Sequence, residues 1–229
     1  MMDGENMTIK LFFEAIIKYL LGLIIVSLLL FIPAQTLEYW NAWLFIGLLF
    51  IPMFIVGIIL MFKDPNLLRR RLDVKEKEQE QRLVLLLSGL MFISSFVVAG
   101  LNFRFKWIEL PNIVVIISSI LFIISYILYG EVLRENSYLL RTIKVEKNQK
   151  LIDTGLYSIV RHPMYLVTII LFLMIPLVLN SIISFFKSLI YPIIIIIRIN
   201  NEEKVLEKEL KEYKEYKKKV KYRLIPYIW

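Results

Sequence analysis

Two groups of ionisable residues stand beside long apolar stretches, where their types and spacing could do chemistry. Arg161, His162 and Pro163 come directly before one such stretch. Proline suits the first turn of a helix, and the unpaired N–H groups of that turn can hold an anionic or carboxylate group. Arg198 and Glu202 lie four residues apart after another apolar stretch, so on a continuous helix they share one face and can pair. Both groups are therefore candidates for binding or catalysis.

Each group also has a purely structural explanation. Arg161 and His162 could anchor a helix at lipid headgroups, and Arg198 with Glu202 could form an interfacial salt bridge beside a solvated glutamate. The stretch 200–203 reads Asn-Asn-Glu-Glu and also resembles a capping box. A new helix beginning there would break the register between Arg198 and Glu202. Position alone leaves these alternatives open.

The elements that must position these residues are membrane helices. Apolar residues make up 58% of the 229-residue chain and charged residues 21%, whereas a soluble domain has about 45–50% apolar residues. A membrane-spanning helix needs ~20 mostly apolar residues. Charge-free runs of that order occupy residues 19–37, 39–62, 83–103, 110–130 and 163–186. The sequence therefore predicts an all-α, polytopic transmembrane helical bundle.

The distribution of lysine and arginine predicts the orientation of the bundle. Most of these residues lie in the N-terminal segment and in segments 63–82, 131–164 and 198–229. Basic segments stay on the cytoplasmic side, so both termini are expected there. The net charge of +8 then reflects topology and a partnership with anionic lipids of that leaflet, and we expect no nucleic-acid partner.

This orientation requires the apolar run 163–186 to turn back inside the membrane. Asn180 and Ser181 interrupt it shortly after Pro176, which predicts a C-terminal helical hairpin with arms near 165–179 and 182–198. Six membrane segments result.

Beyond the hairpin, segment 199–221 has a helical spacing of apolar and aromatic residues. Leu206, Leu210, Tyr213, Tyr216 and Val220 recur every three or four positions. The pattern indicates a helix at the membrane interface or packed under the bundle.

The length favours one domain, with residues 1–62 as an N-terminal helix pair and 63–229 as a catalytic core. The chain has no cysteine and one histidine, so thiolate and multi-histidine metal sites are not expected.

Taken together, the motifs resemble the isoprenylcysteine carboxyl methyltransferase family of integral membrane enzymes, in its bacterial and archaeal branch. The resembling stretches are 155–165 (Gly-Leu-Tyr-Ser-Ile-Val-Arg-His-Pro-Met-Tyr), 198–203 (Arg-Ile-Asn-Asn-Glu-Glu) and 222–226 (Tyr-Arg-Leu-Ile-Pro). The resemblance covers roughly 63–229 and is strongest over 149–229. It implies a methyltransferase that uses S-adenosylmethionine in a cytosolic pocket and methylates a lipophilic acceptor from the bilayer, with a carboxylate of an isoprenylcysteine-like compound as the leading acceptor.

The resemblance also implies roles for individual residues. Arg198 and Glu202 would be catalytic, Arg198 facing the acceptor and Glu202 contacting the cofactor. The other residues implied at the cofactor site are Lys144, Gln149, Lys150, Leu151, Ile152, Tyr157, His162, Pro163, Met164 and Tyr165. Asn180 departs from the family pattern, which usually has glycine there.

Two other functions stay open. Related bundles that reduce sterol double bonds share a similar C-terminal architecture, so an NADPH-dependent membrane reductase is one alternative. A non-enzymatic membrane scaffold or transporter is the other.

Overall fold

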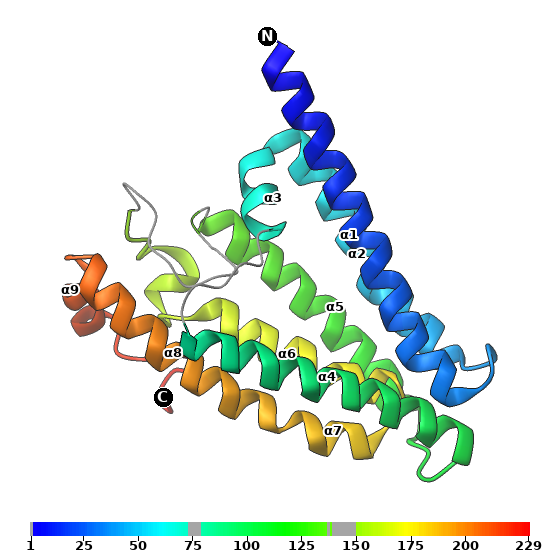
Figure 1. The fold of residues 1–229 in the computed structure, drawn as a ribbon. Helices are drawn as coiled ribbons and strands as arrows, with labels where there is room; N and C mark the ends of the chain where they lie inside the picture. Colours follow the sequence, from blue (N-terminus) through cyan, green and yellow to red (C-terminus); the bar gives the residue numbers. More distant parts are fainter. Residues whose placement is uncertain (1, 73–78, 137, 139–149) are drawn as a thin grey trace.

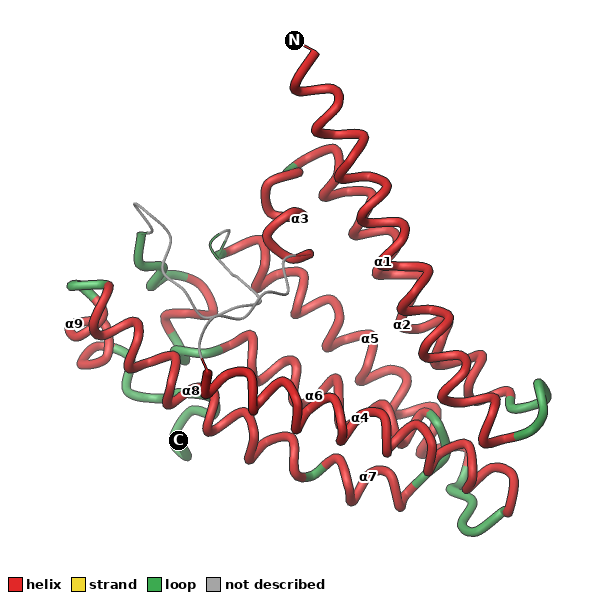
Figure 2. Tube along the Cα trace, viewed as in Figure 1, coloured by secondary structure: helices red, strands yellow, loops and turns green. Residues whose placement is uncertain are grey.

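The computed structural model describes the chain except residues 1, 73–78, 137 and 139–149. Within the described residues every regular element is helical (Figure 2). The helices are α1 (Met2–Ala34), α2 (Trp40–Lys63), α3 (Pro65–Leu72), α4 (Gln79–Phe105), α5 (Asn112–Glu135), the 3₁₀ turn η1 (Gly155–Ser158), α6 (Pro163–Val178), α7 (Ile182–Ser188), α8 (Ile190–Glu209) and α9 (Tyr213–Lys219).

The long helices form a bundle with two distinct ends (Figure 1). Helices α1 and α2 run side by side, and α4, α6 and α8 form a second set next to α5. The turns after α1, α4 and α6 lie together at one end, which we call the turn end. The elements α3, η1 and α9 lie toward the other end, which we call the basic end because it carries most of the lysine and arginine.

The prediction of a polytopic helical membrane protein is confirmed. Five helical segments of the described chain are long and apolar enough to cross a membrane, and α6 is a shorter apolar helix. Large apolar side chains lie exposed along α1, α2 and α5. Such faces suit lipid, because a bilayer accepts apolar side chains while the helix satisfies its own backbone hydrogen bonds. The division of the chain at residue 63 stays a prediction.

The hairpin predicted near Asn180 is present, and Asn180 itself makes the turn. Its φ of 58° lies in the left-handed region, which asparagine tolerates better than most residues other than glycine. The Asn180 side-chain oxygen accepts a hydrogen bond from the Leu110 N–H at 2.6 Å, and its carbonyl accepts one from Asn102 Nδ2 at 3.0 Å. Asparagine thus replaces the expected glycine and adds contacts to α4 and to the loop before α5.

The carbonyl groups that end α6 also receive side-chain donors. The Tyr39 hydroxyl donates to the Leu179 carbonyl at 2.5 Å, and Asn41 Nδ2 donates to the Val178 carbonyl at 3.0 Å. Tyr39 and Asn41 are almost completely buried. Because a helix end leaves carbonyls without intrahelical partners, these bonds let α6 end inside the bundle.

The predicted helix boundaries differ from the structure in three places. Helix α1 begins at Met2, well before the charge-free run, because that run marks the membrane part of a helix and not its ends. The second hairpin arm is broken at Leu189, where Pro192 has no N–H to give to the Ser188 carbonyl. The expected helix over 199–221 is interrupted at residues 210–212, where the chain turns and packs Leu210 against the aromatic face of α9.

Gly100 allows α1 and α4 to cross closely, and this contact provides a test of the packing. A Cβ at Gly100 would lie 2.6 Å from the Leu30 carbonyl oxygen, whereas one at Gly89 on the same helix would meet nothing within 4 Å. We expect Gly100→Ala to lower the free energy of unfolding by about 1–3 kcal/mol, because the helices must separate. Gly89→Ala should be neutral or slightly stabilising. Thermal unfolding in detergent compares the two variants, and equal melting temperatures would contradict the close crossing.

Candidate functional site

The last ten residues fold back onto the start of α6 and are held there by Arg161. The backbone N–H groups of Arg161 and His162 donate to the carbonyls of Tyr222 and Arg223, both at 2.9 Å. The Arg161 Nη1 atom donates to the carbonyls of Val220 and Lys221 at 2.8 and 2.7 Å. This C-terminal segment, residues 220–229, therefore covers the N-terminus of α6.

The carboxylate of Glu203 on α8 joins the same assembly. Its Oε1 atom accepts hydrogen bonds from Arg161 Nε at 2.8 Å and from the Tyr213 hydroxyl at 3.4 Å, and lies 3.2 Å from His162 Nε2. Its Oε2 atom lies 3.1 Å from Arg223 Nη2 and 3.5 Å from Lys217 Nζ. Glu203 and Arg161 are buried, so this ion pair is shielded from water and depends on having its full set of partners.

A second polar group lies one residue away on α8. The Tyr165 hydroxyl donates to Glu202 Oε2 at 2.5 Å and accepts from Arg198 Nε at 2.9 Å. Tyr165 and Arg198 are buried, whereas Glu202 is half-buried. Arg198 and Glu202 share a face of a continuous α8, so the alternative of a new helix at 200–203 is wrong. The Tyr165 hydroxyl bridges the two side chains.

The η1 turn closes the basic end against α5 and α9. The Tyr216 hydroxyl donates to the Tyr157 carbonyl at 2.7 Å. Burial raises the pKa of Tyr157 and Tyr216 well above the usual tyrosine value, so both phenols stay protonated at neutral pH. Gly155 has a φ of 55°, and a Cβ there would lie 1.9 Å from the Glu135 carboxylate. That carboxylate accepts from the Leu156 N–H at 2.9 Å, which fixes η1 to the end of α5.

The structure brings together part of the predicted cofactor set. His162 immediately precedes α6, and Pro163, Met164 and Tyr165 form its first turn. Leu151 packs against α9, while Ile152 and Tyr157 pack together beside α5 and α6. Lys150 is exposed. Lys144 and Gln149 lie outside the described residues.

Sequence reasoning missed the role of Glu203, which contacts four basic side chains among the described residues. The salt-bridge explanation of Arg198 and Glu202 leaves a solvated glutamate beside them, yet Glu203 is buried. The structural explanation makes Arg161 an anchor at lipid headgroups, whereas its side chain ties the C-terminal segment to α6. The helical register could have indicated this. Glu203 is one position after Glu202 on the helix, a rotation of about 100°, so the two side chains point in different directions and contact different elements.

Comparison with known proteins points to a different family from the one expected. A family model described as "Ergosterol biosynthesis ERG4/ERG24 family" matches residues 133–229. The chain is also similar to the Delta(14)-sterol reductase TM7SF2 of Mus musculus, with 32% identity over 93 residues. Those residues are 39% of this chain and 22% of the mouse protein, so the chain matches only about a fifth of that relative's length.

The expectation of an isoprenylcysteine carboxyl methyltransferase is therefore wrong. The matches point to sterol reductases, and they overturn methyl transfer as the activity and S-adenosylmethionine as the cofactor. The motifs at 155–165 and 198–203 lie inside the matched segment. The arginine, histidine and glutamate residues of these motifs therefore indicate the C-terminal architecture, and they do not identify the cofactor.

The ion-pair cluster around Glu203 makes a prediction about stability. Glu203→Gln keeps the size of the side chain but leaves Arg161 buried without its counter-charge, so we expect a loss of about 3–5 kcal/mol. Limited proteolysis should release the C-terminal segment from the variant before the membrane core unfolds. Glu215→Gln on α9 is the matched control, since Glu215 pairs with Lys218 in an exposed position, and we expect no measurable change. Equal protease resistance of both variants and the wild type would contradict the assignment.

Proposed function

We propose that this chain is a membrane-embedded reductase that uses NADPH to saturate a carbon–carbon double bond in a lipophilic substrate from the bilayer. The observation that carries the proposal is that the reductase match over 133–229 contains the whole polar assembly of α6, α8 and the C-terminal segment. A sterol, or a lipid of similar shape, is the substrate class that the relative's name suggests. We place both termini and the site on the cytoplasmic side, where the dinucleotide is available and anionic lipids would face the basic end.

The charges of the basic end suit a phosphorylated cofactor. Around Glu203 and Glu207 lie three cations, Arg161, Lys217 and Arg223, which leaves one net positive charge before His162 is counted. The side chains of Lys217 and Arg223 are 30% and 27% exposed, so both can reach a ligand from the aqueous side. These two residues would hold phosphate groups of NADPH, whose role when bound is to supply a hydride.

Saturation of a double bond also needs a proton, which Tyr165 donates in this proposal. One carbon receives the hydride and the other receives the proton, so the Tyr165 oxygen is left as a phenolate. The Arg198 Nε–H, 2.9 Å from that oxygen, stabilises the negative charge. Glu202 bonds the same hydroxyl and is half-buried, so it can pass a proton from water back to Tyr165. In this proposal Arg198 and Glu202 are catalytic residues that act in proton transfer.

Cofactor binding gives the first test. Purified protein in nanodiscs should quench or enhance NADPH fluorescence saturably, and it should bind NADPH more tightly than NADH if cationic side chains contact the additional phosphate. Arg223→Gln should weaken NADPH binding by about tenfold, which corresponds to one charge-assisted hydrogen bond. Lys187→Gln, near the turn end, is the matched control. If folded wild-type protein does not bind NADPH at all, the reductase proposal is wrong.

The proton-donor role gives a second test. Tyr165→Phe removes only the hydroxyl, and we expect at least a hundredfold loss of kcat for reduction of a sterol double bond, with NADPH affinity unchanged. Tyr191→Phe is the control, since Tyr191 is a buried tyrosine in the same cluster. An unchanged kcat in Tyr165→Phe would assign the proton to another group.

A further inference from the structure

The C-terminal segment contains a tight turn with three exposed apolar side chains. The Ile225 carbonyl accepts the N–H groups of Ile228 and Trp229, both at 3.1 Å. Tyr227 is 89% exposed, Ile228 78% and Ile225 42%. We call residues 225–228 the apolar turn. A group of large exposed apolar side chains is typical of a surface that contacts another molecule or a membrane.

The backbone of the apolar turn holds Tyr227 in a conformation that a bulky residue rarely adopts. Its φ of 66° lies in the left-handed region, where glycine and asparagine are the usual residues and a tyrosine is strained. The turn is held closed because the Trp229 carbonyl accepts the N–H groups of residues 223–225 at 2.9 to 3.2 Å. The turn therefore presents Tyr227 outward at a cost to its own backbone.

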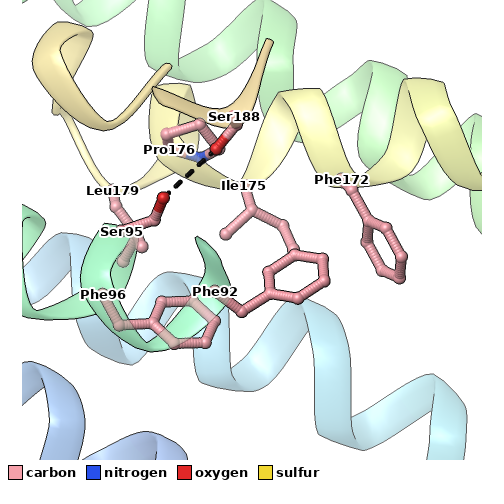
Figure 3. Close-up of a pocket in the computed structure, with 8 residues that line it drawn as sticks. All are labelled: Phe92, Ser95, Phe96, Phe172, Ile175, Pro176, Leu179 and Ser188. Atoms are coloured by element: carbon pink, nitrogen blue, oxygen red, sulfur yellow. Dashed lines mark hydrogen bonds between the residues drawn. The ribbon is translucent and has the colours of Figure 1, made fainter. Parts of the chain in front are cut away.

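The apolar turn is attached to the membrane part of the bundle. Leu224 and Trp229, on its two sides, pack against one apolar cluster of α4, α6 and α8. That cluster consists of Met91, Tyr165, Tyr191, Ile195 and Ile199, with the rings of Phe92 and Phe172 (Figure 3) packed against it. The end of the chain accordingly lies next to α8 (Figure 1).

The turn lies at the level of α8 where apolar residues give way to polar ones. Arg223 Nη1 donates to Asn200 Oδ1 at 3.1 Å, and Asn200 follows closely after the isoleucine run 193–197. Three isoleucines of that run are 39–59% exposed and belong to the lipid-facing surface of a spanning helix. The apolar turn therefore continues this lipid-facing surface at the boundary of the membrane.

The residues around the apolar turn are those of a membrane interface. Tyrosine is enriched where hydrocarbon meets headgroups, because its ring is apolar and its hydroxyl is polar. The rings of Tyr222 and Tyr227 lie 5.2 Å apart, centre to centre. Lys221 is exposed beside them, and its charge suits the anionic headgroups of the cytoplasmic leaflet. This chemistry favours lipid as the material that covers the turn.

We propose that the apolar turn is a membrane anchor. Ile225, Tyr227 and Ile228 enter the interfacial layer of the bilayer beside α8, and Lys221 contacts lipid phosphate groups. Burial of these side chains in lipid offsets the strain at Tyr227. The contact holds the C-terminal segment against the start of α6, so the membrane itself helps to keep the polar assembly covered. This inference goes beyond the proposed reaction and does not depend on it.

Cysteine labelling tests the lipid contact, because the chain has no cysteine of its own. Bimane is attached to Ile228→Cys, to Ile193→Cys on the lipid-facing surface, and to Lys218→Cys, whose side chain on α9 is 74% exposed. The nanodiscs contain phosphatidylcholine and phosphatidylglycerol, with or without bromine on the acyl chains near the headgroups. We expect bromine to quench the labels at 228 and 193 and not the label at 218. Aqueous iodide should quench only the label at 218.

Two results of this experiment would overturn the anchor. If iodide quenches the label at 228 as strongly as the label at 218, the apolar turn lies in water. If neither quencher reaches the label at 228, protein covers the turn, such as a second copy of this chain. Tyr227→Cys, at the most exposed position of the turn, replaces Ile228→Cys if that variant does not fold.

A second experiment asks whether the contact holds the C-terminal segment in place. The N–H groups of Arg161 and His162 bond to carbonyls of that segment, so their hydrogen exchange reports its detachment. Tyr227→Ser with Ile228→Ser should speed this exchange about tenfold in nanodiscs, because the apolar side chains that enter the bilayer are lost. Lys218→Ser is the control and should leave the exchange unchanged. Equal exchange in the double variant and the wild type would overturn the anchor. Neither experiment uses NADPH, so failure of the reductase proposal would show separately.

Discussion

The structure of the basic end depends on one buried carboxylate, that of Glu203. Two of its partners, Arg161 and His162, stand at the start of α6, and two others, Lys217 and Arg223, belong to α9 and the C-terminal segment. A buried charge is tolerated only when opposite charges and donors surround it, so α6, α8, α9 and the C-terminal segment must come together. Their convergence also sets the position of Tyr165 beside Arg198 and Glu202.

At the turn end the helices are joined by neutral groups and not by buried charges. There the unpaired backbone carbonyls after α6 receive neutral donors from Tyr39, Asn41 and Asn102. Neutral hydrogen bonds suit a turn close to the bilayer, where a charge would be expensive to bury. The two ends thus restrain the hairpin α6–α8 in different ways, and the aromatic cluster around Phe92, Phe172 and Tyr191 lies between them.

Local sequence patterns predicted the helices and the hairpin turn, but they could not predict which distant residues pair with each other. Charge-free runs gave the spanning helices, and Asn180 with Ser181 marked the hairpin turn, because both features act within a few residues. The break before α9 was not predicted, because no helix-breaking residue marks it in the sequence. The helix ends there because Leu210 packs against Tyr213, Tyr216 and Val220. The role of Glu203 depends on partners up to 42 residues away in sequence, which no periodic pattern contains.

The wrong choice of cofactor has the same physical origin. A helix that begins with Arg-His-Pro and a partner helix with Arg-x-x-x-Glu-Glu provide cations, carboxylates and phenols at a membrane boundary. Such groups can pair with the phosphates of a dinucleotide or with the amino-acid head of S-adenosylmethionine, so the motifs predict a site without selecting its chemistry. The selection depends on which atom faces the substrate. In the proposed reductase that atom would be the Tyr165 hydroxyl oxygen, because its position between a guanidinium and a carboxylate suits the transfer of a proton.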